Sequence, residues 1–147
     1  MDLPKTILVA TDFSAASEAA LDQAVLLAAK LEAKIYLLHA YVLPIVGLPD
    51  GVLVPSAADA TRIITSAQTD LASAVAKRKG SGIEIHPLLV QADARGAVLT
   101  TAVDLDADLI VMGTHGRKGI ARALIGSVAE AVVRAAPVPV LTVHAPS

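Results

Sequence analysis

Short apolar runs alternate along this chain with longer segments in which apolar residues recur at helical spacing. Five runs are rich in β-branched residues and bounded by turn residues, and they predict strands at 6–10, 34–41, 83–90, 109–112 and 138–143. The segments between them predict four helices, at 15–31, 56–79, 95–105 and 127–136. This alternation predicts an α/β fold with a single doubly wound, five-stranded parallel sheet, right-handed crossovers and helices on both faces.

Two prolines indicate the order of the strands. Pro87 and Pro139 lie in the third and fifth runs, and proline is largely confined to sheet edges, strand starts and bulges because it cannot donate to a ladder. The first, second and fourth runs are continuously apolar, as strands buried on both faces should be. We therefore predict the order 3-2-1-4-5. Its switch point lies between the first and fourth strands, where Asp12 and Gly113 follow the strands and where ligands bind in such sheets.

Polar and turn residues mark the element boundaries. Ser14 and Ser56 are expected to be helix N-caps, and a Gly-Ser-Gly sequence at 80–82 is expected to end the second helix. The stretch from Leu43 to Pro55 contains three prolines and two glycines and is predicted to be a loop. Such a loop could fold over a ligand or cover a partner surface, and the sequence leaves both possibilities open.

Three glycines and a serine near the C-terminus have the spacing that a phosphate cradle requires. Gly113 and Gly116 follow the fourth run, and Gly126 and Ser127 precede the last helix. Glycines let backbone N–H groups approach an anion, and a helix N-terminus adds unpaired donors and partial positive charge. A structural alternative remains open, in which the glycines serve turns and Ser127 forms a capping box with Glu130.

Composition narrows the classes of function. The 147 residues are expected to form one domain over 1–147, with a core of aliphatic side chains, since 54% of residues are apolar and only 2% aromatic. The net charge of −2 and the scarcity of aromatic residues argue against nucleic acid as a partner.

Residue types and segments that the chain lacks argue against a metal site and against a membrane location. It has no cysteine, and its four histidines show no paired ligand spacing, so no metal site built from side chains is expected. The start of the chain has neither the pattern of a signal peptide nor that of a membrane span, so we expect a cytoplasmic protein without a membrane partner.

Segments along the whole chain resemble the universal stress protein family in register: residues 7–14, 107–117, 126–128 and 138–143. The glycine and serine spacing resembles the ATP-binding branch of that family. The resemblance implies an adenine nucleotide alpha hydrolase-like, Rossmann-like fold. It also implies ATP, or AMP or ADP, as the bound nucleotide, with any Mg²⁺ carried by the nucleotide.

The resemblance also assigns roles to individual residues. Asp12 matches an acidic contact to adenine or ribose, and Ala40 matches a small apolar wall beside the adenine. Read without the resemblance, Asp12 is open to the alternative of a helix-entry cap, Met112 to that of a core residue and Arg117 to that of a solvated loop residue. The expected nucleotide-binding residues are Ala10, Asp12, Ala40, Met112, Gly113, Gly116, Arg117, Gly126, Ser127 and Val128.

Three functions follow as hypotheses. The first is a nucleotide-binding regulatory protein of the stress response. The second is a slow Mg²⁺-dependent ATP hydrolase, for which Asp12 and His115 are the visible candidates, although no Walker loop or nucleophile elbow is present and no catalytic residue is assigned. The third is a nucleotide-independent interaction dimer. A homodimer through the short apolar last strand is expected because an uncovered sheet edge invites pairing, and the family resemblance implies the same.

Overall fold

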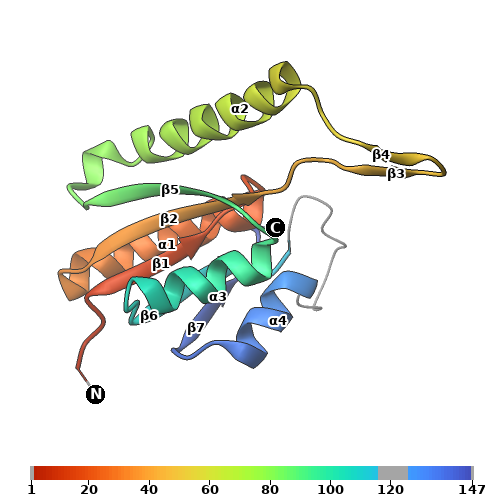
Figure 1. The fold of residues 1–147 in the computed structure, drawn as a ribbon. Helices are drawn as coiled ribbons and strands as arrows, with labels where there is room; N and C mark the ends of the chain where they lie inside the picture. Colours follow the sequence, from red (N-terminus) through yellow and green to blue (C-terminus); the bar gives the residue numbers. More distant parts are fainter. Residues whose placement is uncertain (1, 116–125, 147) are drawn as a thin grey trace.

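The computed structural model describes residues 2–115 and 126–146, and Figure 1 shows its fold. In chain order the elements are β1 (Thr6–Ala10), α1 (Ala15–Leu31), β2 (Lys34–Tyr41), β3 (Val46–Leu48), β4 (Gly51–Leu53), α2 (Ala57–Ala76), a 3₁₀ turn (Lys79–Ser81), β5 (Ile85–Gln91), α3 (Ala94–Asp104), β6 (Leu109–Gly113), α4 (Ser127–Ala135) and β7 (Val140–Val143). Within the described ranges, no helix is both long enough and apolar enough to cross a membrane.

Five of these strands form one parallel sheet in the order β5-β2-β1-β6-β7. Counting only these five, the predicted order 3-2-1-4-5 is confirmed. The prolines are placed as expected, because Pro87 lies in edge strand β5 and Pro139 directly precedes edge strand β7. The central residues of β1 and β6 are fully buried, as strands covered on both faces should be.

Two apolar layers cover the two faces of the sheet. Alternate residues of β1 point to opposite faces, so Ile7 and Val9 pack with α1 and α2, whereas Leu8 packs with α3 and α4. Helix α1 presents a row of buried alanines to the sheet, at positions 16, 20, 24 and 28. Small side chains on this helix allow it to lie close to β1 and β6. The predicted doubly wound arrangement, with helices on both faces, is confirmed.

The stretch from 43 to 55, predicted to be a loop, contains a β-hairpin instead. Strands β3 and β4 pair antiparallel, with Val46 opposite Leu53 and Leu48 opposite Gly51. The prediction was wrong because the prolines lie at the flanks and the turn, while four of the six strand positions hold the aliphatic residues Val46, Leu48, Val52 and Leu53. Figure 1 shows this hairpin extending away from the main sheet beyond the carboxyl end of β2.

The helix caps agree with the sequence at two helices and differ at a third. Ser14 Oγ accepts a hydrogen bond from the N–H of Ser17 at 3.3 Å, and Ser56 Oγ accepts one from the N–H of Asp59 at 3.1 Å. The capping box that the sequence left open as an alternative at α4 is not formed, because Gly126 is the N-cap and Ser127 is already the first helical residue. The hydroxyl of Ser127 therefore lies one position too far along the helix to act as the cap.

One arginine joins the end of α2 to the start of α1. The side chain of Arg78 is only 9% exposed and donates to Glu18 Oε2 at 2.6 Å and to Asp22 Oδ1 at 3.1 Å. It also donates to the carbonyl oxygens of Ala74 and Glu18. These bonds hold the two helices that share one face of the sheet in a fixed relation.

We expect Arg78→Met to lower the free energy of unfolding by about 1–3 kcal/mol, because the charge-assisted hydrogen bonds are lost while the aliphatic stem is kept. Urea denaturation followed by circular dichroism measures the change. Arg62→Met is the matched control, since Arg62 is 79% exposed and pairs only with Asp59 across one helical turn. That variant should stay within about 0.5 kcal/mol of the native protein. Equal effects of both substitutions would contradict the anchoring role of Arg78.

Candidate functional site

The predicted site residues gather where β1 and β6 end side by side. We call residues 10–14, 113–115 and 126–128, together with Ala40, the switch-point site. Ala10 and Gly113 are the last residues of the adjacent strands β1 and β6, and Asp12 follows two residues after β1. Ala40 lies near the carboxyl end of β2, and Gly126 precedes α4. Gly116 and Arg117, which the sequence also placed here, lie outside the described residues.

Gly113 packs directly against the first turn of α1. A Cβ built at Gly113 would lie 2.8 Å from the carbonyl carbon of Ala16 and 2.9 Å from the nitrogen of Ser17. Backbone atoms cannot move aside as a flexible side chain can, so only glycine fits this contact. The end of β6 and the start of α1 are thereby held in backbone contact at the site.

Gly126 makes a similar close contact at the start of α4. Its N–H donates to the carbonyl oxygen of Thr114, and a Cβ at this position would lie 2.6 Å from that same oxygen. Thr114 is itself tied to the edge strand, because its N–H donates to the carbonyl of Val143 at 2.9 Å. The N-terminus of α4 therefore rests on the residue that follows β6.

The first turn of α4 presents unpaired backbone donors. The first N–H groups of any helix have no intrahelical acceptor, and among the described residues no side-chain hydrogen bond caps this helix at Gly126. Ser127 and Val128, the first two helical residues, are exposed. Together with the positive end of the helix dipole, these groups form an arrangement suited to an anion.

A buried polar network orders the loop between β1 and α1. Asp12 Oδ1 accepts hydrogen bonds from the N–H of Ser14 at 3.0 Å and from Ser17 Oγ at 3.1 Å. Thr11 Oγ1 donates to Ser17 Oγ at 3.1 Å and accepts from the N–H of Phe13 at 3.0 Å. The carboxylate of Asp12 thus serves as a helix-entry cap, which the sequence had left as an alternative to nucleotide contact.

His39 and Phe13 support this loop from the side of β2. The Nδ1 atom of His39 lies 2.8 Å from the carbonyl oxygen of Thr11, and the two rings are 4.5 Å apart between centroids. Phe13 has a φ of 65°, a left-handed conformation that costs a non-glycine residue about 1–2 kcal/mol. The contact with His39 and the hydrogen bond to Thr11 hold Phe13 in this conformation.

Three of the predicted contact residues lie against the apolar core. The side chain of Met112 is 5% exposed and belongs to the core layer beneath α3 and α4. This agrees with the alternative stated from the sequence, in which Met112 is a core residue. Ala10 and Ala40 are half-buried at the rim of the same layer. They offer small apolar surfaces beside the polar loop, whereas Met112 can reach the site only through its backbone.

Four polar residues that support the site were not among the predicted residues: Thr11, Ser17, His39 and Thr114. Thr11, Ser17 and Thr114 are buried. Thr114 Oγ1 also lies 3.2 Å from His144 Nδ1, beyond the end of β7. The available signal was a polar side chain at or next to the end of an apolar run, because such a residue must find a hydrogen-bond partner when it is buried.

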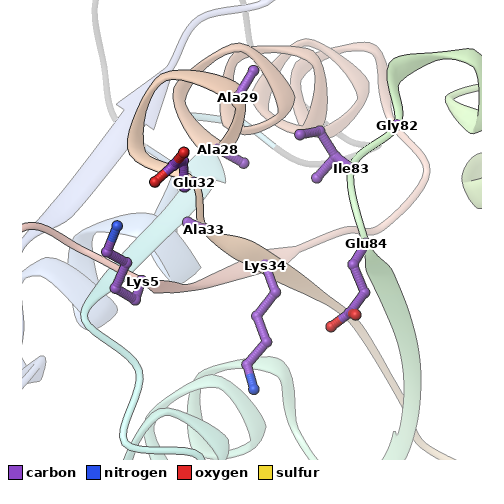
Figure 2. A pocket seen from close by; sticks show the side chains of 9 residues that line it. All are labelled: Lys5, Ala28, Ala29, Glu32, Ala33, Lys34, Gly82, Ile83 and Glu84. Atoms are coloured by element: carbon purple, nitrogen blue, oxygen red, sulfur yellow. The ribbon is translucent and has the colours of Figure 1, made fainter.

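A separate pocket of about 450 Å³ lies at the opposite end of the sheet. Figure 2 shows the charged side chains of Lys5, Glu32, Lys34 and Glu84 around it. A hydrogen bond from His86, at 2.6 Å, and the positive charge of that ring lower the pKa of the exposed Glu84 carboxyl, with a smaller contribution from Lys34. Opposite charges alternate here, so this pocket has no single preferred sign of ligand charge.

Among residues 2–115 and 126–146, no three His, Cys, Asp or Glu side chains are grouped closely enough to hold a metal ion.

The parallel sheet and the glycines at its switch point define a doubly wound α/β protein of the Rossmann-like class. A profile of the universal stress protein family matches residues 4–144, and the chain belongs to that family. This confirms the resemblance read from the sequence.

Individual relatives agree with the family assignment. The chain is 32% identical over 159 aligned positions to universal stress protein MJ0531 of Methanocaldococcus jannaschii, covering 99% of this chain and 85% of that protein. A universal stress family protein from Burkholderia pseudomallei has a TM-score of 0.76 at 28% identity, covering 97% of this chain and 98% of that one. A universal stress protein solved in complex with cAMP has a TM-score of 0.72 at 29% identity, covering 98% and 99% of the two chains.

We expect Gly113→Ala to destabilise the protein by about 1–3 kcal/mol, because the added methyl group meets the backbone of α1. Thermal and urea unfolding measure the effect. Gly80→Ala is the matched control, since nothing lies within 4 Å of a Cβ at that exposed position and its φ is not in the left-handed region. If the two alanine variants were equally stable, the close packing of Gly113 would not constrain the fold.

Proposed function

We propose that this protein binds an adenine nucleotide, ATP or else AMP or ADP, at the switch-point site and acts as a regulatory binding protein in the stress response. The observation that carries the proposal is the pair of glycines, Gly113 and Gly126, held where a Cβ would meet backbone atoms, beside an uncapped helix start. The related universal stress protein solved with cAMP supports the choice of an adenine nucleotide.

The phosphate end of the nucleotide is assigned to the start of α4. The N–H groups of Ser127 and Val128 lack intrahelical acceptors, and the exposed Ser127 hydroxyl is not used as a cap. Backbone donors and a hydroxyl at a helix N-terminus favour an anion. Gly116 and Arg117 are proposed from the sequence to complete the phosphate contacts, and any Mg²⁺ is expected to arrive with the nucleotide.

The nucleoside end is assigned to the loop after β1. The carboxylate of Asp12 can accept a hydrogen bond from a ribose hydroxyl or from the adenine amino group, and its hydrogen bonds to Ser14 and Ser17 fix its position. Ala10 and Ala40 supply half-buried apolar surface nearby, and the backbone of Met112 and Gly113 lies between the two ends.

We expect Ser127→Ala to weaken ATP binding by between about tenfold and a hundredfold, because a hydrogen bond to a charged group contributes about 1.5–3 kcal/mol. Its stability should not fall, because the hydroxyl caps no helix. Isothermal titration calorimetry of nucleotide-free protein with ATP and Mg²⁺ measures affinity, and urea unfolding measures stability. Titration with AMP tests how the affinity depends on the number of phosphates, and titration with GTP tests the preference for adenine.

The matched control is Ser56→Ala. Ser56 caps α2, so its loss should cost about 1 kcal/mol of stability while ATP affinity stays unchanged. Native protein that gives no binding heat and no thermal shift with any adenine nucleotide would refute the proposed function. Unchanged affinity in Ser127→Ala would instead remove this residue from the site.

We also propose that two copies pair through β7. This strand is a sheet edge of four residues, and Leu141 on it is 38% exposed. A short apolar edge presents unpaired backbone groups to a second identical strand, which closes the sheet across a two-fold axis.

A charge on this edge should break that pairing. We expect Leu141→Glu to halve the mass of the assembly measured by sedimentation velocity at micromolar concentration, because the carboxylates of two paired strands repel and resist desolvation. Leu26→Gln, which removes a comparably exposed leucine from α1, should leave the mass unchanged. A Leu141→Glu protein with the native mass would show that β7 is not the interface.

A further inference from the structure

The β3–β4 hairpin carries an unusual density of exposed apolar side chains. Every residue of both strands is exposed. We call the hairpin and its flanking residues, 45–54, the arm. Its large aliphatic residues are each 51–67% exposed: Ile45, Val46, Leu48, Val52, Leu53 and Val54. Single exposed aliphatic residues are ordinary, but a continuous patch of several hundred Å² is rare on a monomer and marks an interaction site.

Both faces of the arm are apolar. Because side chains alternate along a strand, Val46, Leu48 and Leu53 share one face, while Val52 shares the other with the flanking positions 45 and 54. A lone two-stranded hairpin is marginally stable in water unless a face is covered. In Figure 1 the arm stands clear of the main sheet, so the described part of its own chain does not provide that cover.

The charges on the arm limit which class of binding partner its surface fits. Between Val42 and Pro55 there is no lysine or arginine, and the single charged residue is Asp50, at the turn. Nucleic acids and anionic lipid surfaces are bound through basic residues, which this segment lacks. A carboxylate at the tip also opposes insertion into a bilayer. The occupant must be an apolar protein surface.

We propose that the hairpin docks against the same hairpin of a second copy of this chain. Two uncharged arms related by a two-fold axis are self-complementary, and when they lie antiparallel their Asp50 carboxylates are at opposite ends. A hairpin covers only one face of another, so only the three large aliphatic residues of one face count from each arm. With about 100 Å² exposed by each, two arms bury on the order of 600 Å², the size of a small interface.

This interface is distinct from the proposed β7 edge. The hairpin extends from β2, next to edge strand β5, whereas β7 is the opposite edge of the sheet. Two separate two-fold interfaces on one chain join dimers into a larger assembly, which closes as a tetramer when the two axes intersect at a right angle. Nucleotide binding at the switch-point site is not required for this assembly.

Polar variants of each face test the proposal. Val46→Thr with Leu48→Thr alters one face, and Val52→Thr with Val54→Thr alters the other, while the β-branched threonine keeps strand propensity. We expect the full-length native protein to sediment as an assembly larger than a dimer and at least one double variant as a dimer. Combination with Leu141→Glu should give a monomer. Leu26→Gln again serves as the control for loss of an exposed aliphatic residue.

A cysteine scan gives a second, independent readout because the chain has no native thiol. Gly47 lies on the same face as Val52, and a Cβ there meets nothing within 4 Å. We expect Gly47→Cys to form disulfide-linked dimers at least tenfold faster under mild oxidation than Gly80→Cys. The control position is equally open and lies in the 3₁₀ turn after α2.

Several outcomes overturn the hairpin proposal. These are double variants that both keep the native mass, and equal cross-linking rates at positions 47 and 80. A threonine variant that changes ATP affinity but not mass identifies the arm as a cover over its own site. Binding of the native arm to phosphatidylglycerol vesicles, lost in the threonine variants, identifies a membrane surface. Failure of the Leu141→Glu prediction alone removes the β7 interface and leaves the hairpin interface standing.

Discussion

The contact between Gly113 and the first turn of α1 sets the geometry of the carboxyl end of the sheet. Because no Cβ separates them, the end of β6 lies against the backbone of Ala16 and Ser17. Ser17 in that turn joins Thr11 and Asp12 in one hydrogen-bond network. The next residue after β6 is Thr114, and its carbonyl oxygen accepts a hydrogen bond from the N–H of Gly126 at the start of α4. The positions of both helix starts thus depend on how closely β6 approaches α1.

The sequence predicted the main sheet because its signals are local and agree with one another. Apolar runs located the five strands, and Pro87 and Pro139 identified the two edges. The hairpin was missed because prolines frame it and glycines occupy one position in each strand, and these residues outweighed its aliphatic strand positions. The start of the last helix at Ser127 was predicted correctly, and only the alternative in which Ser127 is the cap fails, because Gly126 is the N-cap.

The site was predictable in outline but not in its supporting contacts. Spacing alone indicated that Gly113 and Gly126 belong together, and the strand order placed Asp12 beside them. The contact of Gly113 with Ala16 joins residues almost a hundred positions apart, so no local pattern contains it. The buried hydroxyls of Thr11 and Ser17 acquire their roles only when the loop closes on itself. The roles of Gly116 and Arg117 remain predictions.

The two helix starts at the switch point give this end of the molecule a built-in polarity. At α1 a carboxylate, Asp12, already lies at the helix entry and offsets the positive end of the helix dipole. At α4 none of the side chains in residues 2–115 and 126–146 is hydrogen-bonded as a cap in the corresponding place, and the nearby Glu130 is held by Arg134 further along the helix. The potential therefore becomes more positive from the first helix start toward the second. Any elongated molecule with a single anionic end has one preferred direction in such a field, before any specific contact forms.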